Sequence, residues 1–162
     1  MTFTDGMEWL EARPFATAIA ESEWLFPALE VVHVVALTLV VGSIAVLDLR
    51  LLGVSRKNYG VLQLSAQTLP WTWAAFSIAA ISGVLLFSSA ATSYIDNVPF
   101  RIKLLLILLA GINMAVFHLT AFRHVRSWDR ELPTPIAARV AGTLSLAFWI
   151  CVVFLGRWIG FV

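Results

Sequence analysis

Apolar residues are gathered into long blocks along the chain, and four of these blocks are long enough to cross a lipid bilayer. A transmembrane helix needs about 20 mostly apolar residues to span a hydrocarbon core of roughly 30 Å. The four blocks cover approximately residues 26–52, 70–91, 100–122 and 136–161. Because short loops connect them, neighbouring helices should run antiparallel. The pattern predicts an all-α integral membrane protein, a four-helix bundle with up-down topology formed by residues 26–162.

The first 25 residues carry five acidic side chains and lack the basic stretch that opens a cleaved signal peptide, so we expect this segment to be retained. One side of a short interfacial helix can be formed by its apolar residues Trp9, Leu10, Phe15 and Ile19. Pro14 falls where it can interrupt that helix. The alternative, suggested by the acidity, is a solvated leader.

Composition supports a membrane protein and narrows its function. Hydrophobic residues make up 60% of the chain and charged residues only 13%, whereas soluble domains carry about a quarter charged residues. The net charge of +1, without a basic patch that contains interleaved aromatic residues, argues against nucleic-acid binding. The single cysteine, Cys151, excludes an intramolecular disulfide and is expected to be a packing residue. The expected partner is the lipid bilayer, with a homo-oligomer left open.

The distribution of Lys and Arg predicts the orientation of the bundle, because cytoplasmic loops carry an excess of these residues. The end of the first block and the loops after the first and third blocks hold Arg50, Arg56, Lys57, Arg123, Arg126, Arg130 and Arg139. The opposite side holds Arg13, Arg101, Lys103 and Arg157. This imbalance predicts that those two loops lie in the cytoplasm and that both termini lie outside.

Ionisable side chains inside the blocks fall into two layers, and such residues at lipid depth are costly and usually functional. The outer layer holds Glu30, His33, Lys103 and Arg157. The inner layer holds Asp48, Arg50 and His118, with Arg123 and His124 beyond it. We expect Asp48 and Arg50 to pair with charges near the inner boundary or to reach toward the headgroups. His124 is expected to be an interface residue.

Helical geometry orients these residues. At about 100° per residue, Glu30 and His33 differ by about 60° and share one side of their helix. On the third block, one stripe that spans roughly 80° around the helix axis holds Lys103, Ala110, Met114 and His118. That stripe should face the bundle, because a Lys or His that faces lipid is costly. His33 and His118 lie roughly 15 to 20 Å apart along the membrane normal, so a shared bis-histidine haem site is disfavoured.

Three roles are open for His33. It can be an axial ligand of haem iron, with Lys103 as the second ligand or as a cation facing a haem propionate, and with Arg157 as another propionate partner. Glu30 would then tune His33 through a hydrogen bond. The Glu30 and His33 spacing also matches the Glu-x-x-His element of di-metal sites, which this chain supplies only once. The third role is structural: His33 bonds to Glu30 or to a neighbouring helix and locks the bundle.

Other polar or small residues of the second and third blocks, among them Ser82, Gly83, Gly111 and Asn113, are expected to permit close helix approach. Met114 lies on the Lys103 stripe but is typical of core packing. We therefore do not assign these residues to a site.

Two segments resemble a known group of membrane proteins. ALEVVHVVALTLVVGSIAVLDLRLLG resembles the first core helix of the membrane-bound, haem-containing protoporphyrinogen oxidases and the copper-resistance D membrane proteins, with an early His, a Gly about nine residues later and a terminal Leu-Arg-Leu. FRIKLLLILLAGINMAVFH resembles their third core helix, which starts with a Lys and ends near a His. An uncharacterised family of small four-span bacterial proteins is closer still. The resemblance implies haem b binding, with the essential His and Lys of the oxidases matched by His33 and Lys103.

Together these observations predict a haem b protein that passes electrons between the haem and a partner protein or a quinone. The alternative is a non-catalytic membrane subunit or small-ligand permeation protein whose polar residues lock the bundle. A porphyrinogen-oxidising enzyme is the third hypothesis, and it rests on the resemblance alone.

Overall fold

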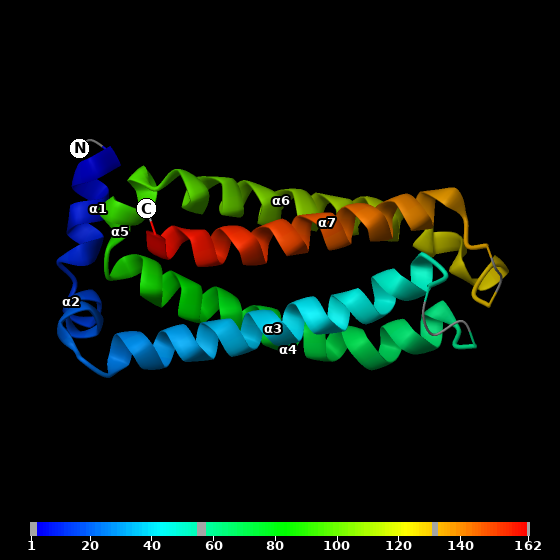
Figure 1. Ribbon diagram of the computed structural model, residues 1–162, viewed down its shortest axis with the longest axis horizontal. Helices are drawn as coiled ribbons and strands as arrows, with labels where there is room; N and C mark the ends of the chain where they lie inside the picture. Colours follow the sequence, from blue (N-terminus) through cyan, green and yellow to red (C-terminus); the bar gives the residue numbers. More distant parts are fainter. Residues whose placement is uncertain (1–2, 55–57, 131–132, 162) are drawn as a thin grey trace.

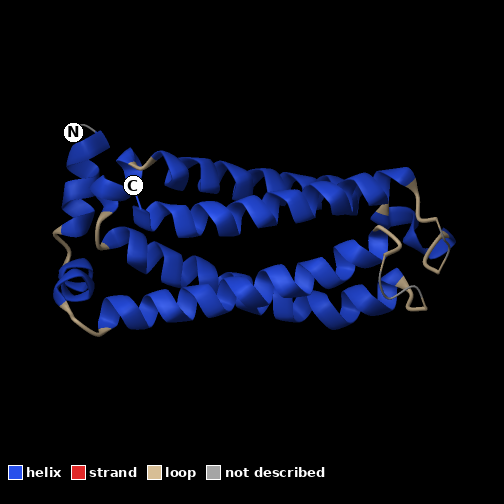
Figure 2. Cartoon of the chain, in the orientation of Figure 1, coloured by secondary structure: helices blue, strands red, loops and turns tan. Residues whose placement is uncertain are grey.

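The computed structural model describes residues 3–54, 58–130 and 133–161, and over these residues the secondary structure is helical with no strand (Figure 2). Four long helices run up and down (Figure 1): α3 (Leu25–Leu51), α4 (Val61–Ser88), α6 (Val98–Leu119) and α7 (Ile136–Trp158). The 3-10 helix η2 (Ile159–Phe161) continues α7. In the part of the chain described, these four are the helices long and apolar enough to cross a membrane. The predicted all-α membrane bundle is confirmed.

The long helices pack as two pairs, α3 with α4 and α6 with α7, and contacts between α3 and α7 join the pairs. The core cluster at one end of the bundle consists of Leu51, Val61, Phe117, Val125, Trp128 and Ala138. On the outer surface, large apolar side chains are exposed, among them Val31, Leu39, Ile81, Leu108 and Ile150. An apolar surface over four spanning helices suits lipid rather than water, so the protein is a multi-pass membrane protein.

Three short helices cover the opposite end of the bundle: α1 (Phe3–Glu11), α2 (Pro14–Glu21) and α5 (Ala91–Asp96) (Figure 1). We call this the outer end, after the predicted orientation, and the other the inner end. Pro14 occupies the first turn of α2, so the N-terminal segment forms two helices rather than the single one expected. The apolar residues of this segment do not form one shared face as expected. Ile19 of α2 is buried against the bundle, whereas Trp9 of α1 and Phe15 of α2 are exposed.

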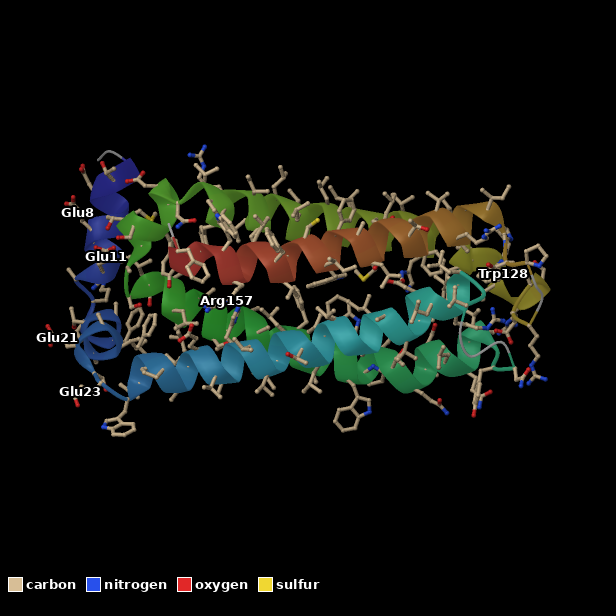
Figure 3. The ribbon with its side chains drawn as sticks, viewed as in Figure 1. Glu8, Glu11, Glu21, Glu23, Trp128 and Arg157 are labelled. Atoms are coloured by element: carbon tan, nitrogen blue, oxygen red, sulfur yellow. The ribbon has the colours of Figure 1, made fainter. Side chains whose placement is uncertain are left out.

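The acidic N-terminal segment is docked on the outer end. Glu11 of α1 accepts hydrogen bonds from the main-chain nitrogen and the hydroxyl of Thr92, at 2.7 and 2.8 Å, and so caps the start of α5. Glu8, Glu21 and Glu23 gather at the same end (Figure 3). This docking argues against a solvated leader.

α4 begins at Val61, nine residues before the start at Pro70 that hydropathy predicts. The first amide groups of a helix need partners from outside it. Here Asp129 supplies them: its carbonyl accepts from the Val61 nitrogen at 3.1 Å, and its Oδ1 from the Leu62 nitrogen at 2.7 Å. Pro70 therefore lies inside α4, where it lacks the amide proton that a helix normally uses.

Arg50 of α3 connects two loops at the inner end of the bundle. Its side chain is fully buried (0% exposed), and it donates from Nε to the Tyr59 carbonyl at 2.8 Å and from Nη2 to the Asp129 carbonyl at 3.0 Å. Among the described residues, two loop carbonyls therefore bind the guanidinium where we expected a charged partner. Of the other basic residues used to predict orientation, Arg56 and Lys57 lie outside the described residues.

Candidate functional site

His33 lies in the outer half of α3, with its half-buried imidazole against α4. Its Nδ1 is 3.0 Å from the Ser82 hydroxyl oxygen. A Cβ atom on Gly83 would come within 3.0 Å of the His33 Cε1 atom, so a glycine here lets the ring approach the α4 backbone. Sequence reasoning assigned Ser82 and Gly83 only to helix approach and missed their contact with His33. The available signal was a Ser-Gly pair in the neighbouring span.

The Ser82 hydroxyl determines which His33 nitrogen carries a proton. Ser82 Oγ donates to the Ile78 carbonyl at 2.7 Å, and the Ala79 carbonyl lies 3.2 Å away. A hydroxyl has one proton and a carbonyl can only accept, so Ser82 must accept from His33 Nδ1. In the neutral ring, Nε2 therefore carries the lone pair.

Lys103 reaches the same layer from α6. Its side chain is half-buried, and its Nζ lies 3.6 Å from the position of a Cβ on Gly156 of α7. α3 and α6 run in the same direction with their first turns at the outer end (Figure 1). His33 and Lys103 therefore both lie in the outer half of the bundle, His33 beside Ser82 of α4 and Lys103 beside Gly156 of α7.

Glu30 lies one turn before His33 but is exposed, and the partner of the His33 Nδ1 comes from α4 instead. The Glu30 charge acts on Tyr94 of α5: burial, and then this charge, raise the pKa of Tyr94. Tyr94 packs against Phe87 and Phe100, with ring centroids 6.3 and 5.2 Å apart. Glu30 therefore borders an aromatic cluster at the outer end.

Arg157 projects from the outer end of α7 (Figure 3) and is exposed. Its guanidinium carbon lies 4.7 Å from the centroid of the Phe161 ring, a cation–π contact. Arg157 follows Gly156, the glycine that Lys103 approaches. Two cationic side chains therefore share the outer end of α6 and α7.

The inner-layer residues form a separate place in the bundle. Asp48 lies about four turns beyond His33 on α3, roughly 22 Å away at ~1.5 Å per residue. His118 is separated from Lys103 on α6 by the same rise, and its Nδ1 is 2.9 Å from the Met114 carbonyl. His33 and His118 therefore cannot bind one iron atom, which agrees with the depth argument.

The outer layer contains a histidine and a lysine, two kinds of side chain that can contact a bound haem. The His33 Nδ1 is held by the Ser82 hydroxyl, and the second ring nitrogen of a metal-binding histidine usually has such a partner. Lys103 offers an amine ligand or a propionate partner. A di-metal site finds no support, because in the described part of the chain no three His, Cys, Asp or Glu side chains are grouped to hold a metal ion.

Comparison with known proteins identifies a family. The sequence profile of a family of unknown function (DUF6644) matches residues 23–162, which include all four spanning helices. No curated protein and no solved structure matches the chain. The match agrees with the expected membership of an uncharacterised family of small membrane proteins. The likeness to the haem-containing oxidases and to the copper-resistance D proteins stays a prediction.

Proposed function

We propose that this chain, which belongs to the DUF6644 family of unknown function, binds haem b in its outer layer and takes part in electron transfer within the membrane. The observation that carries the proposal is the hydrogen bond between His33 and Ser82, because with Nδ1 as the donor the lone pair of the neutral ring is on Nε2, where it can bind a metal. Haem b supplies one-electron redox chemistry when bound.

Three of the four outer-layer residues, together with Ser82, have a role in this proposal. His33 is the axial ligand through Nε2, and Ser82 is a positioning residue that fixes the tautomer and the ring. Lys103 is the second ligand or pairs with a propionate, and Arg157 is a further propionate partner. Ser82 takes the tuning role that the sequence suggested for Glu30.

We place the protein in the bacterial cytoplasmic membrane with both termini outside. The acidic side chains of α1 and α2 gather at one end (Figure 3), while Arg123 and Arg126 lie in η1 (Phe122–Ser127) at the other. This distribution follows the rule that basic loops stay in the cytoplasm. The haem layer then lies near the outer face, where a redox partner protein or a quinone would exchange electrons with it.

Haem binding is tested with His33→Ala and Ser82→Ala, expressed in haem-sufficient cells and purified for haem content and Soret absorbance. We expect His33→Ala to lose its haem and Ser82→Ala to keep it with a shifted spectrum. His124→Ala is the matched control, because His124 is an exposed histidine at the inner end. A folded His33→Ala protein with unchanged haem content would contradict the assignment.

A non-catalytic membrane subunit or permeation protein is the second candidate, and the same bond favours it because His33 and Ser82 join α3 to α4. An interhelical hydrogen bond of this kind contributes about 0.6 kcal/mol. In this case His33→Ala and Ser82→Ala lower stability by similar amounts, and wild-type protein has no Soret band. Unfolding and absorbance measured on the same samples separate the two candidates.

A further inference from the structure

A second candidate site lies in the inner half of the bundle, where α3, α4, α6 and α7 surround a cavity of about 300 Å³. Its wall is mostly apolar and includes the rings of Phe76, Phe117 and Trp149. The cavity borders the turns of α4 on both sides of Pro70. Small-molecule sites are typically cavities of roughly 300 to 1,000 Å³ with apolar walls and a few polar groups.

The wall contains a buried carboxylate. Asp48 of α3 is 5% exposed, and the Ser145 hydroxyl of α7 donates to it, yet its Oδ2 has no hydrogen-bond partner. A Cβ on Gly142 would lie 3.3 Å from the Asp48 carbonyl, so α7 packs closely against this turn of α3 and holds it in place. An unpaired carboxylate oxygen at this depth is costly, and either a bound proton or a donor on a ligand removes that cost.

Most other polar side chains of the wall already donate hydrogen bonds to carbonyls of the chain. His118 donates from Nδ1 to a carbonyl one turn earlier at 2.9 Å, so its Nε2 is left as an acceptor. The hydroxyls of Thr68 and Thr72 each donate to a carbonyl one turn earlier in α4. Asn113 donates one of its two amide protons to a carbonyl of α7 at 2.9 Å and keeps the second proton and its side-chain oxygen. The acceptors left at the wall are therefore Asp48, His118 and Asn113.

The cavity is separate from the outer layer and close to the lipid. Neither His33 nor Lys103 lines it. Trp73 and Met114 do line it, and they are 51% and 39% exposed on the bundle. These two residues therefore border the cavity and also lie on the outer surface of the bundle.

We propose that this cavity binds a small lipophilic molecule that carries a hydroxyl or an ammonium group. The donor of the ligand pairs with the Asp48 carboxylate, and its apolar part packs on the aromatic wall. The site rejects an analogue of the same shape that lacks the donor, because the Asp48 oxygen then stays unpaired. The inference is independent of haem binding, since it uses other residues.

Binding is measured by titrating the purified full-length protein in detergent with three probes, naphthol, naphthylmethylammonium and methoxynaphthalene, by calorimetry. We expect at least one donor-bearing probe to bind about tenfold or more tightly than methoxynaphthalene, because a hydrogen bond to a carboxylate is stronger than a neutral one. The comparison of naphthol with the ammonium probe shows which donor the site takes.

Asp48→Asn is expected to weaken binding of the preferred probe at least about tenfold. Asp96→Asn is the matched control, because Asp96 is an exposed aspartate of α5, and it should bind as wild type does. If Asp48→Asn fails to fold, His118→Phe decides instead, and a several-fold loss of the preference is expected. Equal binding of methoxynaphthalene, unchanged binding by folded Asp48→Asn, or no binding of either donor-bearing probe to wild type would overturn the proposal.

Discussion

The Nδ1 atom of His33 lies 3.0 Å from the hydroxyl oxygen of Ser82, and this bond crosses from α3 to α4 in the outer half of the bundle. Because the Ser82 proton goes to the Ile78 carbonyl, the bond runs from His33 to Ser82. The same contact therefore joins two helices and leaves Nε2 free. These consequences can be measured separately, as stability and as ligand binding.

Ser82→Ala should lower the free energy of unfolding by about 0.6 to 1.7 kcal/mol, the range measured for hydrogen bonds between membrane helices. Ser77→Ala is the matched control, because Ser77 is an exposed serine of α4 that donates within its own helix, to the Trp73 carbonyl. Reversible unfolding in mixed detergent micelles provides the measurement. Equal losses in the two variants would show that the His33 bond adds no stability.

Gly83→Ala should disturb the His33 ring, because the added Cβ would come within 3.0 Å of the His33 Cε1 atom. Overpacking of this kind costs about 1 to 3 kcal/mol. Gly42→Ala is the control, since a Cβ at that position of α3 meets no atom within 4 Å. Thermal unfolding of both variants checks the prediction, and it is wrong if Gly83→Ala is as stable as Gly42→Ala.

Arg50→Ala removes a buried guanidinium and its two hydrogen bonds to carbonyls of Tyr59 and Asp129. Bonds to charged groups contribute about 1.5 to 3 kcal/mol each, so we expect a loss of about 3 kcal/mol or more. Arg139→Ala, at an exposed position of α7, should change stability by less than about 0.5 kcal/mol. Chemical unfolding of the two proteins tests this ranking, which similar midpoints would refute.

The pKa of Tyr94 is raised above its ordinary value of 10.0, first by burial and then by the Glu30 charge. A group whose pKa is higher in the folded state contributes stability that is complete below the unfolded pKa and is lost as pH rises through the folded pKa. The chain has two tyrosines, so Tyr94→Phe identifies the Tyr94 step in a tyrosinate absorbance titration. Glu30→Gln should move that step to lower pH, and an unmoved step would contradict the contact.

Hydropathy predicted the spanning helices because an apolar run of this length must satisfy its backbone internally in lipid. Hydropathy did not predict the start of α4, because the first amide groups of this helix bind Asp129, which is far away in the sequence. The partners of Arg50 were not predicted either, because they are carbonyls of two separate loops. Contacts between distant segments leave no periodic signal.

The level shared by His33 and Lys103 followed from helical rise alone, because both residues are near the outer ends of helices that run in one direction. The contact with Ser82 did not follow, since it depends on how far α4 is rotated and shifted against α3. The cavity beside Asp48 depends on the packing of four helices at once. Depth can therefore be read from one sequence, whereas partners across helices require the structure.

Haem binding by the outer layer is tested most directly by the reduced-minus-oxidised absorbance spectrum of wild-type protein, purified from haem-sufficient cells and shown to be folded and monodisperse. We predict a Soret band and b-type α and β bands that disappear in His33→Ala and persist in His124→Ala. A folded wild-type protein without a Soret band would contradict it.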